Sequence, residues 1–588
     1  MKLKHFFLFV ILSLVLSLSG ISCSGSTNPG NSSQTPSSQQ TPGETTETTE
    51  TPESTETTET TESTEPAEPV ELDNTLTAMK LAKAMECGWN LGNTLDARGS
   101  WLPESKVFPF NQGLDSETCW GEVETTKAII ETGIKNGYKT IRIPVTWSNH
   151  LTDTNYTIDP AWMNRVKQIV NWAYDAGYYV ILNEHHSVHD DMNSPLKKCE
   201  GYIVTTESAA ESKAFLKAIW TQICQNFNDE YDEHLIFETM NEPRDTAHEH
   251  CWNTQPDTCD ICKAEVALVN EYNQLILDTI RSSGGNNANR FVMVPAMGTG
   301  INEALKDGFK LPEDSASDRL IVTGHMYPLD SGGTGTGSHN FNTATQNEIT
   351  YNTRSLYSKF VSKGIPVVIG EFGAARVGYT SDGEKISDFV ITAQDRLDCF
   401  SYFAQQAGKY SMPFINWDCG GDNGMATINR KKCSVYEPEY LAAVIKAWKD
   451  GNAGAQTAES VIEPEEVSLD GLGVWDTTES SFDNQTKILT LSADWGKGGA
   501  NIWVGGKIIS DFKTIEVSYK KATSDFRCWV SYAEDPEGTE YVPSIFEASD
   551  DLTTKTINLD STKKLKMIFF QCQGKAVSIT LDKIILKP

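Results

Sequence analysis

Two glutamates, Glu242 and Glu371, form the pair of side chains best suited to carry out chemistry. Glu242 stands between Asn241 and Pro243 at the end of an apolar run, and Glu371 directly follows another apolar run. Two carboxyl groups on either side of a bond can act as proton donor and attacking carboxylate, as cleavage of a glycosidic bond requires. The structural alternative is that both are ion-paired residues at the rim of a fold.

Further polar and aromatic side chains occur where other apolar runs end. These are Asn90, Asn93, Arg142, Glu184, His185, His186, Asn241, His325, Tyr327, Trp417 and Asp418. Arg142, His325 and Tyr327 could keep an attacking glutamate ionised through charge and hydrogen bonds. The Asn241 amide could bind a sugar hydroxyl, and the Trp417 indole offers a flat face for a pyranose ring. We expect substrate contacts from Asn90, Arg142, His185, His186, Asn241, His325, Tyr327 and Trp417, and neither a metal nor a cofactor at this site.

Eight short apolar runs place these residues at comparable positions. The runs span residues 87–91, 140–145, 178–182, 235–240, 290–295, 320–325, 366–370 and 412–417. Amphipathic segments such as 162–176 and 212–228 separate them, and this alternation predicts a parallel sheet. Eight such units within residues 75–451 predict an α/β fold, a (β/α)₈ TIM barrel, whose reactive face lies at the strand C-termini. A doubly wound sheet is the alternative, but no Gly-x-Gly-x-x-Gly follows the first run.

Five segments resemble those of glycoside hydrolase family 5. They read Gly-Trp-Asn-Leu-Gly-Asn-Thr at 88–94, Ile-Arg-Ile-Pro-Val at 141–145, Asn-Glu-His-His at 183–186, Met-Asn-Glu-Pro at 240–243 and Ile-Gly-Glu-Phe-Gly at 369–373. The resemblance implies a retaining mechanism with Glu242 as acid/base and Glu371 as nucleophile. It implies supporting roles for Arg142, His185, Asn241, His325, Tyr327 and Trp417.

Family members of this kind are mostly endoglucanases, so the resemblance implies hydrolysis of internal β-1,4-glucosidic bonds in plant cell-wall polysaccharide. Some members cleave xyloglucan, mannan or xylan, and these substrates stay open. The chain departs from the family at Glu184, where an apolar or small residue is commoner, and in a long cysteine-rich loop after Pro243. Both departures bear on which sugars the cleft accepts.

Two other classes of protein are compatible with parts of the pattern. One is a surface lipoprotein that binds glycans without cleaving them, although the presence of both glutamates argues against it. The other is a metal-dependent barrel hydrolase with His185, His186 and Asp418 as ligands. No His-x-His follows the first apolar run to support a metal cluster there.

The N-terminus predicts export. Lys2 and Lys4 precede an apolar run at 6–18 and small residues, which is typical of a signal peptide over residues 1–22. Cys23 follows and could carry a lipid, so the chain is expected either at the bacterial cell surface on a membrane tether or free outside the cell. Residues 23–74 predict a disordered linker, because ten glutamates recur at every third position from Glu44 to Glu71 without a basic residue. The net charge of −31 argues against nucleic acid as a partner.

The cysteines lead to a separate prediction. The chain has 13 cysteines, and Cys251, Cys259 and Cys262 are clustered just after His248 and His250. A Cys-x-x-Cys with flanking histidines could bind zinc. In an oxidising compartment a loop closed by a disulfide is the favoured interpretation.

The C-terminal part has a different pattern. A short linker is expected at 452–466, and residues 467–588 read as period-two strands, at 487–492, 514–519, 527–532, 566–571 and 578–586, which predict a small all-β sandwich. Its aromatic residues include Trp475, Trp495, Trp503, Trp529 and Tyr541. Attached to a glycanase it resembles a carbohydrate-binding module, and a surface-attachment module is the alternative. We expect a monomer whose partner is β-glucan.

Overall fold

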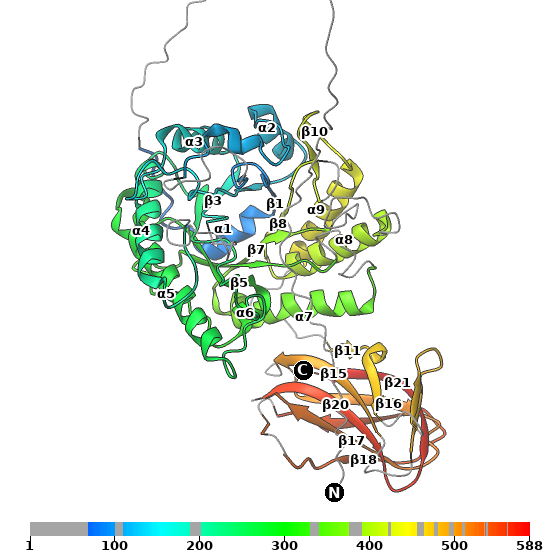
Figure 1. Cartoon of the computed structure of the whole chain (residues 1–588). Helices are drawn as coiled ribbons and strands as arrows, with labels where there is room; N and C mark the ends of the chain where they lie inside the picture. Colours follow the sequence, from blue (N-terminus) through cyan, green and yellow to red (C-terminus); the bar gives the residue numbers. More distant parts are fainter. Residues whose placement is uncertain are drawn as a thin grey trace, which may run out of the picture.

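Eight parallel strands close into a barrel in the computed structural model of the chain (Figure 1). They are β1 (Cys87–Asn90), β2 (Thr140–Ile143), β3 (Tyr179–Asn183), β4 (Leu235–Glu238), β5 (Val292–Gly300), β6 (Leu320–His325), β7 (Val367–Phe372) and β8 (Phe414–Asn416). The barrel closes because β1 pairs with both β2 and β8, with Gly88 opposite Thr140 on one side and Ile415 on the other. Each expected run overlaps one strand, so the predicted (β/α)₈ barrel is confirmed.

The structure describes residues 69–587 except 100–109, 188–200, 330–339, 375–390, 422–424, 455–463, 476–479, 493–498, 509–511, 534, 537–538 and 561–562. The signal peptide, Cys23 and most of both expected linkers lie outside the described residues, so the domain boundaries stay predictions. Residues 69–74 lie against the barrel, where the Val70 amide donates to the Asp229 carbonyl at 2.8 Å. No helix within the described ranges is long and apolar enough to cross a membrane.

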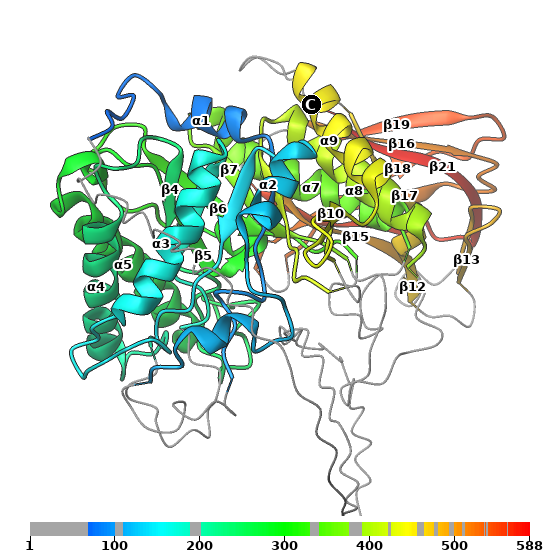
Figure 2. The same ribbon diagram turned by 90° about the horizontal axis from the view of Figure 1, so that it is seen from above.

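Helices surround the strands, as Figure 2 shows from above. They are α1 (Ala78–Met85), α2 (Lys127–Lys135), α3 (Pro160–Asp175), α4 (Ala209–Asn226), α5 (Asp260–Ser282), α6 (Ile301–Leu305), α7 (Thr343–Lys359), α8 (Ala393–Lys409) and α9 (Pro438–Ala453). Short 3₁₀ helices are η2 (Leu114–Thr118), η3 (Gly285–Ala288), η4 (Val361–Lys363) and η5 (Leu469–Gly471). Two short strands, β9 (Ile428–Asn429) and β10 (Ser434–Val435), pair with each other. Local sequence explains several helix starts. For example, Pro160 occupies the first turn of α3 and the Asp159 carboxylate caps it.

The apolar core of the barrel lies in two layers. The outer layer packs strand residues such as Trp89 and Leu182 against the helices. The inner layer joins Ile181, Ile236 and Ile321 of the strands to Leu81 of α1. Helix α1 therefore contributes to the interior packing, and this rigid base leaves the opposite ends of the strands to carry functional side chains.

Residues 465–587 form a second body of antiparallel strands. These are β11 (Glu465–Val467), β12 (Leu472–Trp475), β13 (Ser481–Asp483), β14 (Ile488–Leu491), β15 (Gly499–Ile508), β16 (Thr514–Lys520), β17 (Phe526–Tyr532), β18 (Ser544–Phe546), β19 (Thr553–Asn558), β20 (Lys564–Cys572) and β21 (Val577–Lys587). One sheet has the order β13-β14-β21-β16-β19 with β11 beside β21, and the other has the order β12-β15-β20-β17-β18. A buried apolar cluster lies between them, which confirms the predicted β-sandwich.

Aromatic side chains gather on the outer face of the β12-β15-β20-β17-β18 sheet. The Phe569 ring stacks on Trp529 at 5.1 Å and meets Trp475 edge-on at 6.1 Å. Trp503 on the same sheet is 66% exposed. A Cβ at Gly499 would lie 2.1 Å from the Trp475 ring, so glycine allows this indole to lie across β15. These tryptophans are not core residues; Trp495 lies outside the described residues.

The sandwich contacts the barrel at α7, which lies nearest to it in Figure 1. The guanidinium of Arg354 in α7 lies 4.1 Å from the centroid of the Phe512 ring and 3.6 Å from the Glu465 carboxylate. Both partners belong to the sandwich, so Arg354 contacts it from the barrel.

Candidate active site

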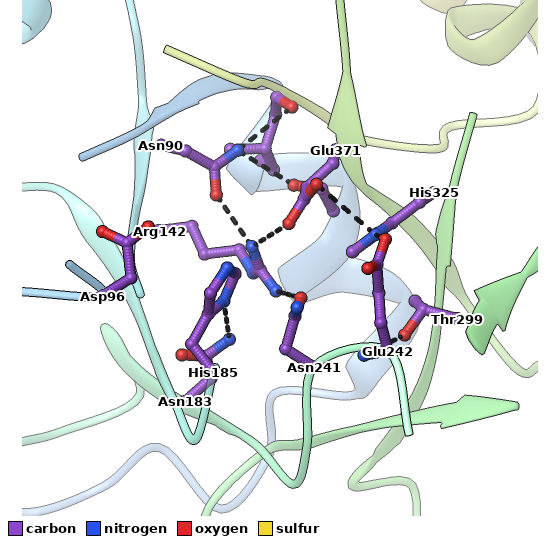
Figure 3. A network of polar contacts seen from close by, with 12 residues as sticks. Asn90, Asp96, Arg142, Asn183, His185, Asn241, Glu242, Thr299, His325 and Glu371 are labelled. Carbon is purple, nitrogen blue, oxygen red and sulfur yellow. Dashed lines mark hydrogen bonds and ion pairs between the residues drawn. The ribbon is translucent and has the colours of Figure 1, made fainter. Parts of the chain in front are cut away.

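Arg142 on β2 is the centre of a buried polar network at the C-terminal ends of the strands (Figure 3). Its Nε donates to Glu238 at 2.6 Å, its Nη1 donates to Glu371 at 2.8 Å and to Asn90 at 2.9 Å, and its Nη2 donates to Asn241 at 2.7 Å. Burial disfavours the charged guanidinium, but Glu238 and Glu371 outweigh this and raise the Arg142 pKa above its ordinary value. Arg142 is thus a fixed cation beneath the barrel mouth.

Glu371 near the end of β7 accepts hydrogen bonds on both carboxylate oxygens. Arg142 donates to Oε1, and the Tyr327 hydroxyl donates to Oε2 at 2.6 Å. The His325 Nδ1 lies 3.5 Å from Oε2. The two donors therefore fix the orientation of the carboxylate, whose side chain is 7% exposed.

Glu242 follows β4 and adopts a left-handed backbone conformation, with φ of 44°. Such a conformation is uncommon for a residue with a side chain, and it persists here because neighbouring groups hold it. The Glu242 amide donates to Thr299 Oγ1 at 2.9 Å, and Arg244 Nη1 donates to the Glu242 carbonyl at 2.8 Å. The His325 Nδ1 lies 3.0 Å from Glu242 Oε1. These contacts hold the Glu242 carboxyl close to that of Glu371.

The two carboxyl groups lie close enough to influence each other's titration, because atoms of Glu242, His325 and Glu371 all lie within 4.8 Å of one another. Burial raises the pKa of Glu371 above its ordinary value, although His325, Arg142 and the Tyr327 hydrogen bond oppose this. Burial acts on Glu242 in the same direction, but the hydrogen bond and charge of His325 lower its pKa below the ordinary value. Among the groups that lower the Glu242 pKa, the His325 hydrogen bond is the largest contributor.

His185, His186 and Trp417 form a second side of the site. The His185 ring is parallel to the Trp417 indole at 5.6 Å and lies 4.3 Å from the His186 ring. Burial and nearby positive groups hold the His185 pKa well below its ordinary value, so this imidazole is neutral. A Cβ at Gly92 would lie 2.9 Å from the Trp417 ring, so glycine is needed where the indole approaches the backbone.

The structure places all the expected site residues in this region, although two lie beneath its surface. Asn90 and Arg142 are fully buried. The Asn90 amide donates to the carbonyls of Gly370 and Asn416, each at 3.1 Å. Asn90 therefore positions Arg142 from below the cleft, while Asn241 extends the network on the side of Glu242.

Sequence reasoning missed the residues that support this network. Glu238, fully buried in β4, pairs with Arg142 and also accepts from Asn183 at 3.0 Å and Thr323 at 2.9 Å. A charged residue inside an apolar strand is a signal that could have identified Glu238. Thr299 and Arg244, which hold Glu242, carry no such signal because their role depends on the loop conformation.

Asp418 does not lie with the histidine pair, as the alternative of a metal site formed by these three residues would require. Its carboxylate accepts from the amides of Gly420, Thr427 and Ile428 and pairs with Arg430 at 3.1 Å. These contacts make Asp418 the anchor of the chain after β8. The acidic residue beside the histidine pair is Asp96, 3.9 Å from His186.

The expected disulfide in the loop after Pro243 is wrong. Cys251, Cys259 and Cys262 are all free thiols. Cys259 Sγ lies 3.6 Å from the Nε2 of His248, and Cys262 Sγ lies 3.5 Å from the Nδ1 of His250. The two thiols of the Cys-x-x-Cys thus face imidazoles, an arrangement that cysteine spacing alone does not reveal.

A closed (β/α)₈ barrel with two carboxyl groups above its strand ends defines a class of glycoside hydrolases. The family model described as cellulase (glycosyl hydrolase family 5) matches residues 98–423. The chain belongs to glycosyl hydrolase family 5.

Known proteins similar to this chain agree with that assignment. Endoglucanase B of Ruminococcus albus is 35% identical over 393 residues, which are 65% of this chain and 84% of the relative. The structure of a family 5 lichenase from Caldicellulosiruptor sp. F32 is 34% identical, covers 65% of this chain and all of its own, and gives a TM-score of 0.55. A GH5-4 broad-specificity endoglucanase from Ruminococcus champanellensis with bound cellotriose is 34% identical over 64% of this chain and all of its own, with a TM-score of 0.53.

Proposed function

We propose that the chain is an exported, retaining endo-β-1,4-glucanase with Glu371 as nucleophile and Glu242 as acid/base. One observation carries this proposal: atoms of the two carboxyl groups lie within 4.8 Å of each other. Retaining glycosidases hold their carboxyl groups about 5 Å apart, whereas inverting enzymes need about 6.5 to 9.5 Å to admit a water molecule. The separation therefore favours double displacement.

Donor geometry supports the assignment of the two roles. Arg142 and the Tyr327 hydroxyl donate to the two oxygens of Glu371, and a guanidinium cannot accept a proton in return. Burial raises the pKa of Glu371 and the His325 contact lowers that of Glu242, which is the opposite order. We base the roles on the donors, because both oxygens of Glu371 accept a hydrogen bond and this favours its ionised form. The contact of Glu242 Oε2 with Arg244 is longer, at 3.5 Å, and we assign the proton for the leaving group to this carboxyl.

In the first step, a Glu371 oxygen forms a bond to the anomeric carbon as the bond from that carbon to the leaving oxygen breaks. The bonding electron pair stays on the leaving oxygen, which takes the Glu242 proton. In the second step, Glu242 removes a proton from water while the water oxygen attacks the anomeric carbon and releases Glu371. Both carboxyl groups return to their starting states, and the product keeps the configuration of the substrate.

The surrounding side chains suit a sugar in the cleft. Asn241 accepts from Arg142 through its oxygen, so its NH₂ group is left to bind a hydroxyl beside the cleaved bond. The Trp417 indole and the neutral His185 imidazole provide a stacking face and a hydrogen-bonding group on another side. These groups recognise uncharged sugars and need no charge on the substrate.

A substrate panel tests the proposed reaction. Release of reducing ends is measured on soluble cellulose derivatives, mixed-linkage β-glucan, xyloglucan, mannan and xylan, with and without a chelator, and early product anomers are read by NMR. We expect cleavage of β-1,4-glucans with the β-anomer formed first. Initial formation of the α-anomer would contradict the retaining mechanism, and activity confined to xyloglucan, mannan or xylan would contradict the glucanase assignment.

We also propose that the sandwich binds β-glucan. Trp475, Phe569, Trp529 and the exposed Trp503 present a row of rings on one sheet, which suits stacking against a flat glucan chain. Arg354 of the barrel contacts the sandwich at Phe512, and Trp503 on the outer face of the β12-β15-β20-β17-β18 sheet is exposed. A surface-attachment role is the competing outcome.

The N-terminal pattern supports export, and we propose that a lipid on Cys23 holds the enzyme outside a bacterial cell with the acidic tract as a spacer. Fractionation of cells that produce the wild-type chain or Cys23→Ser tests the tether. The wild type is expected with the membranes and the variant in the medium. Equal amounts of both proteins in the medium would show that the tract is only a linker.

A further inference from the structure

The loop that follows Glu242 brings four potential metal ligands together. It connects β4 to α5 and contains His248 and His250, while Cys259 and Cys262 stand at the start of α5. One ligand atom from each of the four residues lies within 4.8 Å of the others. None of these four side chains takes part in the proposed hydrolysis.

The distances between sulfur and nitrogen atoms are those of a tetrahedral zinc site. Zinc binds sulfur at about 2.3 Å and nitrogen at about 2.0 to 2.1 Å, so tetrahedral ligands place S and N about 3.5 Å apart. The observed distances are 3.6 Å from Cys259 Sγ to His248 Nε2 and 3.5 Å from Cys262 Sγ to His250 Nδ1. We propose that His248, His250, Cys259 and Cys262 bind one Zn²⁺ ion.

A carboxylate behind one ligand supports this proposal independently. Glu265 in α5 is buried, and its Oε2 lies 2.9 Å from the Nδ1 of His248. Metal-binding histidines commonly use their second nitrogen in this way, because the carboxylate fixes the tautomer and turns the other nitrogen to the metal. Glu265 thus holds His248 with Nε2 directed toward Cys259.

The ligand set also identifies the kind of metal and its role. Two thiolates and two neutral imidazoles neutralise a divalent ion and suit zinc rather than magnesium or calcium, which prefer oxygen. Four protein ligands fill a tetrahedral site and leave no position for water, which is typical of structural zinc. The ion would close the loop onto α5, as the expected disulfide would have done.

This loop reaches the surroundings of Glu242. Trp252, between the histidines and the cysteines, packs under the Arg244 guanidinium at 4.3 Å. Arg244 in turn donates to the Glu242 carbonyl and lies 3.5 Å from its carboxyl group. The zinc site therefore holds a loop that positions Glu242; this second part rests on the proposed acid/base role.

Metal analysis of the purified full-length chain tests the site without reference to activity. We expect about one zinc ion per chain, falling below about a tenth in Cys259→Ser/Cys262→Ser. Cys251→Ser is the matched control, because Cys251 lies in the same loop but outside the group of four, and it should keep its zinc. Cobalt substitution of the wild type should give thiolate-to-cobalt charge-transfer bands and the visible bands of a tetrahedral ion.

Three results would overturn the site. They are a wild-type chain that takes up no zinc when reduced and supplied with Zn²⁺, zinc that stays bound in the double variant, or cobalt spectra without thiolate bands. Mass spectrometry that finds a Cys259–Cys262 disulfide in the exported protein would also overturn it. The link to Glu242 has its own test: removal of zinc should slow cleavage of polysaccharide more than cleavage of an aryl cellobioside with a good leaving group. An equal loss on both substrates would overturn that link alone.

Discussion

The Nε of Arg142 lies 2.6 Å from the Glu238 carboxylate, and neither side chain is exposed to solvent. The same guanidinium donates to Glu371 through Nη1. Glu238 therefore fixes the orientation of the cation that in turn holds Glu371. It is a positioning residue, since it lies behind Arg142 and is fully buried.

Glu238→Gln should damage both stability and activity. Removal of one partner from a buried ion pair leaves the other charge poorly compensated, and we expect a loss of about 3 kcal/mol in the free energy of unfolding. The Arg142 guanidinium should then turn, so kcat should fall while KM changes little. Urea unfolding and steady-state kinetics measure the two effects. Glu131→Gln is the control, because its pair with Lys135 is exposed and should contribute less than about 0.5 kcal/mol.

The two glutamates should respond differently to the leaving group. Glu242→Gln removes the proposed proton donor, so activity on soluble glucan should fall by about 10² to 10⁴-fold. An aryl cellobioside with a good leaving group needs little protonation and should form the covalent intermediate at nearly the wild-type rate. Glu371→Gln should remove activity on both substrates. Substantial turnover of soluble glucan by Glu371→Gln would contradict the assignment of the nucleophile.

Tyr327→Phe should shift the pH profile on its acid side. The Tyr327 hydrogen bond lowers the pKa of Glu371, so its removal raises that pKa and keeps the proposed nucleophile protonated up to a higher pH. The acid limb of kcat/KM should therefore move to higher pH. A hydrogen bond to a charged group contributes about 1.5 to 3 kcal/mol, which corresponds to a loss of about 10- to 100-fold in rate. Tyr357→Phe, on the outer helix α7, is the control and should leave the pH profile unchanged. If the acid limb of Tyr327→Phe stays at the wild-type pH, the Tyr327 hydrogen bond does not control the Glu371 pKa.

Glu184→Gln should change how stability depends on pH. Burial raises the Glu184 pKa from 4.5 to about 8, so the folded protein holds a proton there that the unfolded chain loses above about pH 4.5. Stability from this group is complete below pH 4.5 and declines as pH rises toward 8. Glutamine keeps an acceptor for the Ser187 amide, which lies 3.1 Å from Glu184 Oε1. The variant should unfold at a higher temperature than the wild type at pH 8 and show a smaller difference at pH 4.5; parallel Tm curves would disprove this account.

Trp503→Ala should weaken glucan binding by the sandwich without unfolding it, because the indole is 66% exposed. Loss of one stacking ring should cost about 1 kcal/mol, or about fivefold in affinity, measured as retention in glucan-containing gels. Catalysis is inactivated in both proteins by Glu371→Gln so that the gel is not degraded. Leu552→Ala is the control, since it is 60% exposed and adjoins β19 of the other sheet. If the two variants migrate alike, the result would contradict glucan binding by the sandwich and favour a surface-attachment role.

The barrel strands could be predicted because strands buried on both faces appear in the sequence as unbroken apolar runs. Their ends then located Glu242, Glu371 and Trp417, since side chains at strand ends share one face of the barrel. Glu238 was missed although it interrupts such a run, because its partner Arg142 lies 96 positions away and only the closed barrel brings them together. Burial of Asn90 beneath the cleft depends in the same way on packing.

The loop after Pro243 shows a different limit. Sequence spacing identified Cys259 and Cys262 as a reactive pair, but it could not say whether the thiols face each other or the imidazoles of His248 and His250. That choice depends on how the loop folds onto α5, where Glu265 turns one of the histidines. Thr299 could not be predicted for a similar reason, since its hydrogen bond from the Glu242 amide depends on the positive φ of Glu242.

The long sequence separations within the Arg142 network have a consequence for the growing chain. During synthesis Arg142 appears 96 positions before Glu238 and 229 positions before Glu371. A nascent polypeptide that ends before β7 contains Arg142 and Glu238 but lacks Glu371, the second acidic partner of Arg142. In that fragment β1 also lacks β8, the strand with which it pairs when the barrel closes. Every N-terminal fragment that ends before β8 lacks the strand that closes the barrel, so the Arg142 network can be complete within a closed barrel only after the chain has passed β8.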